Sequence, residues 1–411
     1  MTNRAERRAR GKHKDQAGSS SPMRILFASN APFAPTGYGV QTAQLVSRMI
    51  ADGHEVAIAC NYGLSGAQTN WGGVQLYPTG TSPYSDDVLH AHSQHWFAGS
   101  NLPTLVMTLF DVWALKNPTI DRIERLAAWT PIDHQPSPPE VSAWLRKPNV
   151  MPIAMSKFGS EMMSVDKLEH EYVPHAIEKV FAPTPSIKDA DGTPVTGREI
   201  MKIDEDRFVV MMNAANKGKT PPRKAFGENL LAFSMFAAKH EDAMLYLHTD
   251  QSEALGGINL GALIAACGIK EQQVRFIDQY MFRMNIPQDA LAAIYTAADV
   301  LLACSAGEGF GVPVIEAQAC GTRVIVTAAT AQPELVGDGW TINAQPLWDP
   351  FQNSWLFSPR IGEIVQALEE SYERPRGVSQ EAVKFAAGYD ADLVYAEHWR
   401  PVLARLATWR P

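Results

Sequence analysis

Two glutamates stand in a glycine-rich stretch with seven residues between them. The stretch "SAGEGFGVPVIEAQACGTRVI" covers residues 305–325, and its carboxylates belong to Glu308 and Glu316. It follows the apolar run "ADVLLAC", which predicts a strand, while Pro313 suits the start of a short helix and Gly321 suits its end. We therefore expect Glu308 in a loop and Glu316 in a helix. Each carboxylate there can accept two hydrogen bonds from the vicinal diol of a ribose or a sugar.

The glycines of this loop predict a close approach between the backbone and a ligand. Glycine has no Cβ, so nearby backbone N–H groups can reach an oxygen of a sugar or a phosphate. The start of a helix also favours negative charge. The residues expected to contact such a ligand are Gly309, Phe310, Gly311 and Val312.

Short apolar runs alternate with amphipathic runs on both sides of this loop. In the first half they predict strands at 23–29, 54–60, 104–110, 127–133 and 150–156, and a helix at 40–53 whose buried face holds Val40, Ala43, Val46, Met49 and Ile50. In the second half they predict strands at 207–213, 243–248, 274–278 and 300–305, and helices at 225–239, 258–268 and 288–298. Such βαβ units build parallel sheets, whose ligands bind at the carboxyl ends of the strands. The predicted fold class is α/β, with two doubly wound, Rossmann-like domains facing a cleft.

Breaks in this alternation set the expected domain limits. The segment 174–197 is rich in proline, glycine and charge, which predicts a connector. The expected parts are a disordered basic tail at 1–21, a first domain at 22–180, a second domain at 200–378, and a helical segment at 379–411 that packs across the domains.

Charge is unevenly distributed along the 411 residues. The net charge of −8 argues against nonspecific nucleic-acid binding by the body of the protein, which would need a basic face. The tail instead carries several cations and almost nothing apolar: Arg4, Arg7, Arg8, Arg10, Lys12 and Lys14. It is either a solubilising or weakly docking arm, or a specific contact with an anionic partner such as nucleic acid or a membrane.

The sequence predicts neither a membrane-targeting signal nor a cysteine spacing typical of a metal site or of disulfide pairs. The N-terminal tail lacks the apolar stretch of a signal peptide, and no apolar run approaches the length of a membrane helix, so we expect a cytoplasmic protein without a transmembrane segment. The four cysteines are far apart or on expected core elements, which predicts buried free thiols: Cys60, Cys267, Cys304 and Cys320.

The stretch at 305–325 resembles the E-x(7)-E signature of retaining glycosyltransferases of the GT-B fold, in family 4 (glycosyl transferases group 1). The resemblance extends over nearly the whole chain from Met23. It implies a nucleoside-diphosphate sugar donor, UDP- or GDP-linked, bound mainly by the second domain, with the base near 275–280. It also implies that Glu308 acts at the transferred sugar, that Glu316 holds the ribose, and that the acceptor binds mainly to the first domain.

The resemblance assigns further donor contacts. "PFAPTGYGVQ" is similar to the family's N-terminal glycine loop, so Gly37 and Gly39 are expected near the diphosphate. Arg223 and Lys224 resemble the basic pair that neutralises the departing diphosphate, with Lys219 as a weaker third candidate. The implied chemistry needs no cofactor and no metal, and "DAD" at 189–191 is expected to be a solvated turn.

The sequence also departs from the family pattern. Asn216 stands near the place of the usual arginine, Phe110 replaces a histidine, and Ala176 and Glu178 replace a glycine and an aspartate in the connector. The next strand end supplies Asp133 and His134, expected as catalytic residues that point toward the cleft.

Weaker candidates stand at other strand ends and at the hinge. They are Asp111, His175, Thr249 and Asp250. Trp96, Trp113 and Trp144 either line an acceptor groove or belong to the core.

Three other functions stay open on the sequence alone. A nucleotide-sugar epimerase or a sugar phosphorylase would share the fold and the motif. A nucleic-acid or scaffold-binding protein would use the tail and leave the cleft inactive. A transferase directed by its tail would act on modified DNA or on a polymer surface.

Overall fold

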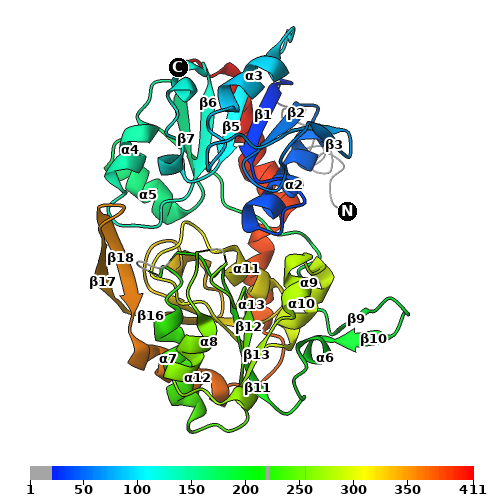
Figure 1. The fold of residues 1–411 in the computed structure, drawn as a ribbon, viewed down its shortest axis with the longest axis vertical. Helices are drawn as coiled ribbons and strands as arrows, with labels where there is room; N and C mark the ends of the chain where they lie inside the picture. Colours follow the sequence, from blue (N-terminus) through cyan, green and yellow to red (C-terminus); the bar gives the residue numbers. More distant parts are fainter. Residues whose placement is uncertain (1–20, 219–221, 255) are drawn as a thin grey trace, which may run out of the picture.

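The computed structural model describes residues 21–218, 222–254 and 256–411, which form two sheets flanked by helices (Figure 1). Both sheets are built from parallel βαβ units, which confirms the predicted α/β class with two doubly wound, Rossmann-like halves. The basic tail up to residue 20 and Lys219 lie outside the described residues.

The first sheet has its apolar strands in the order β3-β4-β2-β1-β5-β6-β7-β8, and only β3 runs antiparallel to its neighbour. The strands are β1 Arg24–Ser29, β2 Glu55–Cys60, β3 Thr69–Trp71, β4 Val74–Tyr77, β5 Thr104–Leu109, β6 Leu126–Thr130, β7 Val150–Ala154 and β8 Glu171–Tyr172. The chain order reverses between β1 and β5, which places a ligand crevice at their carboxyl ends.

Helices α2 (Gly37–Ala51), α3 (Leu89–Phe97), α4 (Pro139–Leu145) and α5 (Lys157–Val165) cover this sheet. Helix α2 begins three residues before the expected start, because Thr36 caps it by accepting a hydrogen bond from the Gly39 N–H at 3.0 Å. The predicted buried face was partly wrong: Val46 and Met49 are buried, whereas Ile50 is exposed.

The second sheet has the order β13-β12-β11-β14-β15-β16, all parallel. Its strands are β11 Phe208–Asn213, β12 Ala243–His248, β13 Val274–Phe276, β14 Val300–Leu302, β15 Arg323–Thr327 and β16 Gly339–Ile342. Its helices are α7 Phe226–Ala237, α8 Leu260–Ala266, α9 Gln279–Arg283, α10 Gln288–Ala297, α11 Val312–Ala319 and α12 Ile361–Glu373. The order reverses between β11 and β14, so the second ligand crevice lies at the ends of these two strands.

Two hairpins project from the second half. The connector forms β9 (Ser186–Lys188) and β10 (Pro194–Thr196) before α6 (Gly197–Met201), and Asp189 in its exposed turn accepts bonds from the backbone of Asp191 and Thr193. The other hairpin, β17 (Ala344–Asp349) with β18 (Ser354–Pro359), was not predicted. It reaches up to the first half, where the Gln135 N–H donates to the Trp355 carbonyl at 3.1 Å (Figure 1).

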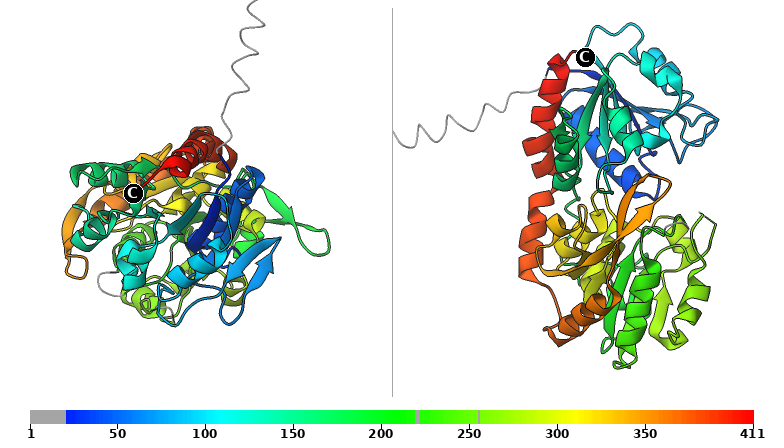
Figure 2. Two further views of the ribbon diagram at one scale, coloured as in Figure 1. Left: turned by 90° about the horizontal axis from the view of Figure 1, so that it is seen from above. Right: turned by 90° about the vertical axis from the view of Figure 1, so that its left-hand side faces the viewer.

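The end of the chain lies along both halves (Figure 2). Helix α13 (Gln380–Ala386) follows Ser379, whose N–H donates to the Gly321 carbonyl at the end of α11. After α14 (Ala391–Val394), helix α15 (Arg400–Thr408) packs on the first half. Arg400 there forms a bidentate pair with Asp52 at 2.7 and 2.8 Å.

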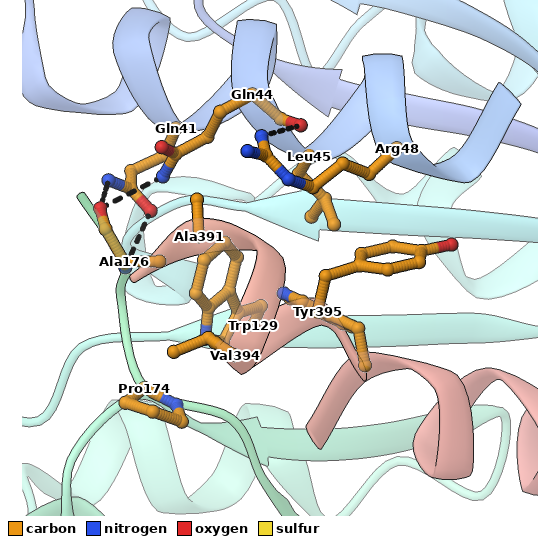
Figure 3. A pocket seen from close by; sticks show the side chains of 11 residues that line it. Gln41, Gln44, Leu45, Arg48, Trp129, Pro174, Ala176, Ala391, Val394 and Tyr395 are labelled. Atoms are coloured by element: carbon orange, nitrogen blue, oxygen red, sulfur yellow. Dashed lines mark hydrogen bonds between the residues drawn. The ribbon is translucent and has the colours of Figure 1, made fainter. Parts of the chain in front are cut away.

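A cavity of about 10 Å³ lies between α2, the connector and α14 (Figure 3). Beside it the side-chain amides of Gln41 and Gln44 both donate to the Ala176 carbonyl, at 2.7 and 3.0 Å. Arg48, one turn further along α2, pairs with Glu178 at 2.7 Å. The two connector residues that depart from the family pattern are therefore anchored to α2.

All four cysteines are free thiols; Cys60, Cys304 and Cys320 are buried and Cys267 is partly exposed. Within the described ranges, no helix is both long and apolar enough to cross a membrane. Over the same residues, no cluster of three or more His, Cys, Asp or Glu side chains has the arrangement of a metal site.

Candidate active site

The crevice between β11 and β14 brings three charged side chains together. Arg223 and Lys224 lie in the loop that joins β11 to α7, and Glu308 lies in the loop that follows β14. The Arg223 guanidinium donates to one Glu308 oxygen at 2.9 Å, and the Lys224 ammonium pairs with the other oxygen. Arg223 also donates to the Gly307 carbonyl at 2.6 Å. The Glu308 carboxylate is thus paired with both cations.

Burial and the charges of the neighbouring groups have opposite effects on the ionisation of this cluster. Burial raises the pKa of Glu308, but the charges of Lys224 and Arg223 outweigh it and lower the pKa to about 2. For Arg223, burial is outweighed by the charges of Glu308 and Asp133, and the pKa is raised. For Lys224, burial dominates and lowers the pKa.

Asp133 brings the first half into the same cluster. Its carboxylate follows β6 and lies 3.6 Å from the Arg223 Nε atom. Burial alone would raise its pKa, yet the hydrogen bond from His134 and the charge of Arg223 lower it to about 2. Asp133 is therefore an anion beside the cations of the second half.

His134 does not face an open cleft, contrary to the expectation. The side chain is buried, with one ring nitrogen 2.6 Å from Asp133 and the other 3.1 Å from Asp349 on β17. Burial lowers its pKa, but the bonds and charges of the two aspartates outweigh this effect and raise it. In this structure His134 orients Asp133 and joins it to the hairpin of the second half.

The crevice of the first sheet holds Asp111 at the end of β5 and Tyr38 at the start of α2. The Tyr38 hydroxyl donates to Asp111 at 3.4 Å. Burial and the charge of Asp133 raise the pKa of Asp111 to about 6. Gly37 at the start of α2 is exposed, with open space where a Cβ would be, whereas the Gly39 N–H already donates to Thr36.

The glycine loop packs against the first half as well as bordering the crevice. A Cβ on Gly307 would lie 2.2 Å from the Asp133 carbonyl, and one on Gly309 would lie 2.2 Å from the Pro131 Cβ. These glycines therefore allow a close approach between the halves, which differs from the predicted approach of Gly309 to a ligand.

Helix α11 begins directly after this loop. Gly311 is its N-cap at φ +119°, a left-handed conformation that favours glycine. In its first turn Pro313 has no N–H and the Val314 N–H donates to the Gly311 carbonyl at 2.9 Å, so the Val312 N–H is the group that a ligand could bond. Phe310 is buried against His175 at 5.3 Å between ring centres.

Glu316 lies in α11, as expected, on a buried chain of hydrogen bonds. The Asn213 amide donates to the Tyr295 hydroxyl at 2.6 Å, and that hydroxyl donates to Glu316 at 3.0 Å. Burial raises the pKa of Glu316 to about 7, although the Tyr295 bond opposes the shift. The two glutamates therefore differ in ionisation as well as in position.

Several weaker candidates have structural partners. Thr249 donates to the Ala214 carbonyl at 2.6 Å, and Asp250 pairs with Arg283 at 2.8 Å. The Asn216 amide, which stands where the usual arginine is missing, donates to the backbone carbonyls of Asp250, Ser252 and Ile258. His175 is buried beside Gln41 at 3.0 Å, and burial lowers its pKa to about 3.

The three tryptophans divide between core and crevice. Trp96 donates to the Ile25 carbonyl at 3.0 Å, and Trp144 is buried and donates to the Leu115 carbonyl at 2.9 Å. Both belong to the packing of the first half. Trp113 instead lies just after β5 and contacts Phe351 of the second half at 5.4 Å between ring centres.

Sequence reasoning missed Asp349, Tyr295 and Glu334. Glu334 accepts the N–H groups of Lys157 and Phe158 at 2.8 and 3.0 Å, so a residue of the second half caps α5 of the first. Tyr295 lies on a helix that was predicted, and its hydroxyl was the one feature of the sequence that could have indicated a buried hydrogen bond. Asp349 lies in a hairpin for which no turn signal was recognised.

Comparison with known proteins agrees with this architecture. Residues 259–356 match the family model Glycosyl transferases group 1. A D-inositol 3-phosphate glycosyltransferase of Mycobacteroides abscessus is 32% identical over 138 residues, and O-antigen chain mannosyltransferase B of Escherichia coli is 30% identical over 115 residues. These alignments cover 33% and 26% of the chain, and each spans only 29% of the relative.

Solved structures match over most of the chain. Sucrose-phosphate synthase of Thermosynechococcus elongatus has a TM-score of 0.68 at 15% identity, covering 90% of this chain and 96% of that one. Anabaena HepE in complex with UDP-glucose has a TM-score of 0.63 at 13% identity, covering 93% and 98%. The chain has the GT-B fold, and its residues 259–356 are similar to the glycosyl transferases group 1 family.

Proposed function

We propose that the chain is a retaining glycosyltransferase that moves a sugar from a nucleoside-diphosphate sugar to an acceptor hydroxyl. One observation carries the proposal: Arg223, Lys224 and Glu308 meet at the strand ends where the sheet order reverses, next to the start of α11. Such a place suits a diphosphate, because cations and free N–H groups stabilise its charge.

The departing diphosphate would take the place of Glu308 as partner of the two cations. Arg223 and Lys224 are preorganised and partly shielded from water, so they would stabilise the developing negative charge without a metal ion. Glu308, released from one or both cations, would then face the sugar, where positive charge develops as the glycosidic bond breaks. Glu316 would accept hydrogen bonds from the ribose hydroxyls.

Asp133 is proposed as the first-half carboxylate at the reacting centre, because it is ionised and near Arg223. His134 holds it in place. The donor is proposed to be UDP- or GDP-linked; the UDP-glucose bound to the structurally similar Anabaena protein supports the UDP form.

Release of nucleoside diphosphate tests this function. The full chain is incubated with UDP-glucose or GDP-mannose, with and without a mixture of oligosaccharides and glycolipids as acceptors. We expect release that depends on the acceptor. Conversion of the donor into another nucleotide sugar without any acceptor would indicate an epimerase, and the absence of nucleotide binding would contradict the proposal.

A further inference from the structure

Aromatic rings form a continuous row from the first crevice to the β17–β18 hairpin. Tyr38 lies 6.4 Å from Phe110, and Phe110 lies 5.8 Å from Tyr84, measured between ring centres. Tyr84 lies 5.9 Å from Trp113, which lies 5.4 Å from Phe351. The row therefore joins the two halves of the molecule.

The outer part of the row is accessible. Phe351 is 65% exposed and Tyr84 is 38% exposed, while Trp113 between them is half-buried and Phe110 is buried. Tyr84 and Phe351 lie on either side of Trp113, and their exposed rings leave apolar area in water, which a ligand can cover. The inner part ends at Tyr38, which donates to Asp111.

The chemistry of the row at the β17–β18 hairpin favours a sugar ring over a charged ligand. Among residues 344–359 the single charged side chain is Asp349, which is buried and held by His134. Uncharged amides accompany the rings at the tip of the hairpin, where Gln352 follows Phe351 and the next residue, Asn353, is exposed. A pyranose has a C–H face that packs on an aromatic ring, and hydroxyls on its rim that bond to amides.

We propose that Tyr84, Trp113 and Phe351 form an acceptor subsite that binds a neutral sugar ring. The proposal rests on the transferase function argued above and names its acceptor as a carbohydrate. A sugar on these rings would lie along the row that leads to Asp111 and the reacting centre. Because Phe351 belongs to the second half, such an acceptor would also hold the halves together.

Binding of oligosaccharides to the full chain tests the subsite. An array of neutral oligosaccharides of glucose, galactose, mannose and N-acetylglucosamine is screened, and the affinity for those that bind is measured for each variant. Phe351→Ala and Trp113→Ala are each expected to weaken binding about tenfold, the scale of one lost aromatic anchor. Trp113→Phe, which keeps a ring, should restore most of the affinity.

Trp348→Ala is the matched control, because Trp348 is an exposed aromatic of the same hairpin that lies outside the row. Its affinity for oligosaccharides should be within about twofold of that of the unmodified chain, because residues outside a binding site's central contacts contribute little binding energy. UDP affinity, measured in the same samples, should be equal in all variants.

The proposed subsite is contradicted if UDP binds but no oligosaccharide does. It is also contradicted if UDP binds and Phe351→Ala has the same affinity for oligosaccharides as the unmodified chain. Capture by phosphatidylcholine vesicles that depends on Trp113 and Phe351 would contradict it in favour of a membrane contact. Failure of UDP to bind at all would instead contradict the proposed function.

Discussion

Glu308 accepts a hydrogen bond from Arg223 at 2.9 Å across 85 positions of the sequence. Its other oxygen is paired with Lys224, so one carboxylate occupies both cations proposed to bind the donor diphosphate. Under the proposed function, donor binding would be an exchange of anions. The diphosphate would replace the Glu308 carboxylate, which would remain in the site for the transfer step.

Replacing Glu308 should separate catalysis from nucleotide binding. Glu308→Gln removes the competing charge, so UDP affinity should be unchanged or higher, while turnover should fall a hundredfold or more, on the scale of one lost transition-state contact of about 2.7 to 4 kcal/mol. Calorimetric titration with UDP and initial rates measure the two effects. Glu161→Gln, an exposed change on α5, is the control; a loss of UDP affinity in Glu308→Gln alone would refute the exchange.

Glu316 should make donor affinity depend on pH. Its pKa of about 7 means that it is largely protonated at pH 6, whereas a ribose diol bonds best to the ionised form. UDP-glucose has no phosphate proton that titrates near neutrality, so its affinity should rise about tenfold from pH 6 to pH 8. Glu316→Gln should bind more weakly and lose this rise. A rise of equal size in Glu316→Gln would assign the titration to another group.

The close approach of the two halves should depend on the absence of a Cβ at Gly309. In Gly309→Ala the new Cβ would lie 2.2 Å from the Pro131 Cβ, so the loop must shift, at a cost of about 1 to 3 kcal/mol in the free energy of unfolding. Gly362→Ala, where a Cβ meets nothing within 4 Å, is the matched control. Denaturant unfolding compares the two. Equal stability of both variants would show that the contact between the halves is not tight.

The hydrogen bonds of His134 with Asp133 and Asp349 should add to the free energy of unfolding, and this contribution should be lost as pH rises. The folded pKa of His134 is raised above its unfolded value, so the contribution is fully present below about pH 6.5, the unfolded value, and disappears as pH rises through the folded pKa. His134→Gln should remove this component, which is measured as the difference in unfolding free energy between pH 6 and pH 8. Asp349→Asn, which removes one carboxylate partner, should reduce the component. An unchanged pH dependence of the unfolding free energy in His134→Gln would contradict this role of His134.

The sequence predicted those features that depend on local pattern. Apolar runs located nine of the parallel strands, whereas β4, β8, β15 and β16 were not predicted. Pro313 located the start of α11 and Gly321 its end, because an early proline and a glycine after the last turn are local requirements. The separation of Glu308 in a loop from Glu316 in a helix followed from the same signals.

Contacts between distant segments were not predictable in this way. His134 and Asp349 are 215 positions apart, and nothing near either residue signals the other. The Glu334 cap of α5 likewise joins residues 177 positions apart. The exposure of Ile50 was missed because the face that α2 buries is set by the connector and the C-terminal helices, which periodicity alone does not locate.

Calorimetric titration of UDP in EDTA, with the unmodified chain and with the Arg223→Ala, Lys224→Ala double variant, tests the central claim most directly. The unmodified chain is expected to bind without a metal ion, because side-chain cations and backbone N–H groups hold the diphosphate. The double variant should bind at least a hundredfold more weakly, since two charge-assisted contacts of about 1.5 to 3 kcal/mol each are lost. Equal affinity in the double variant, or binding that requires added magnesium or manganese, would contradict the account.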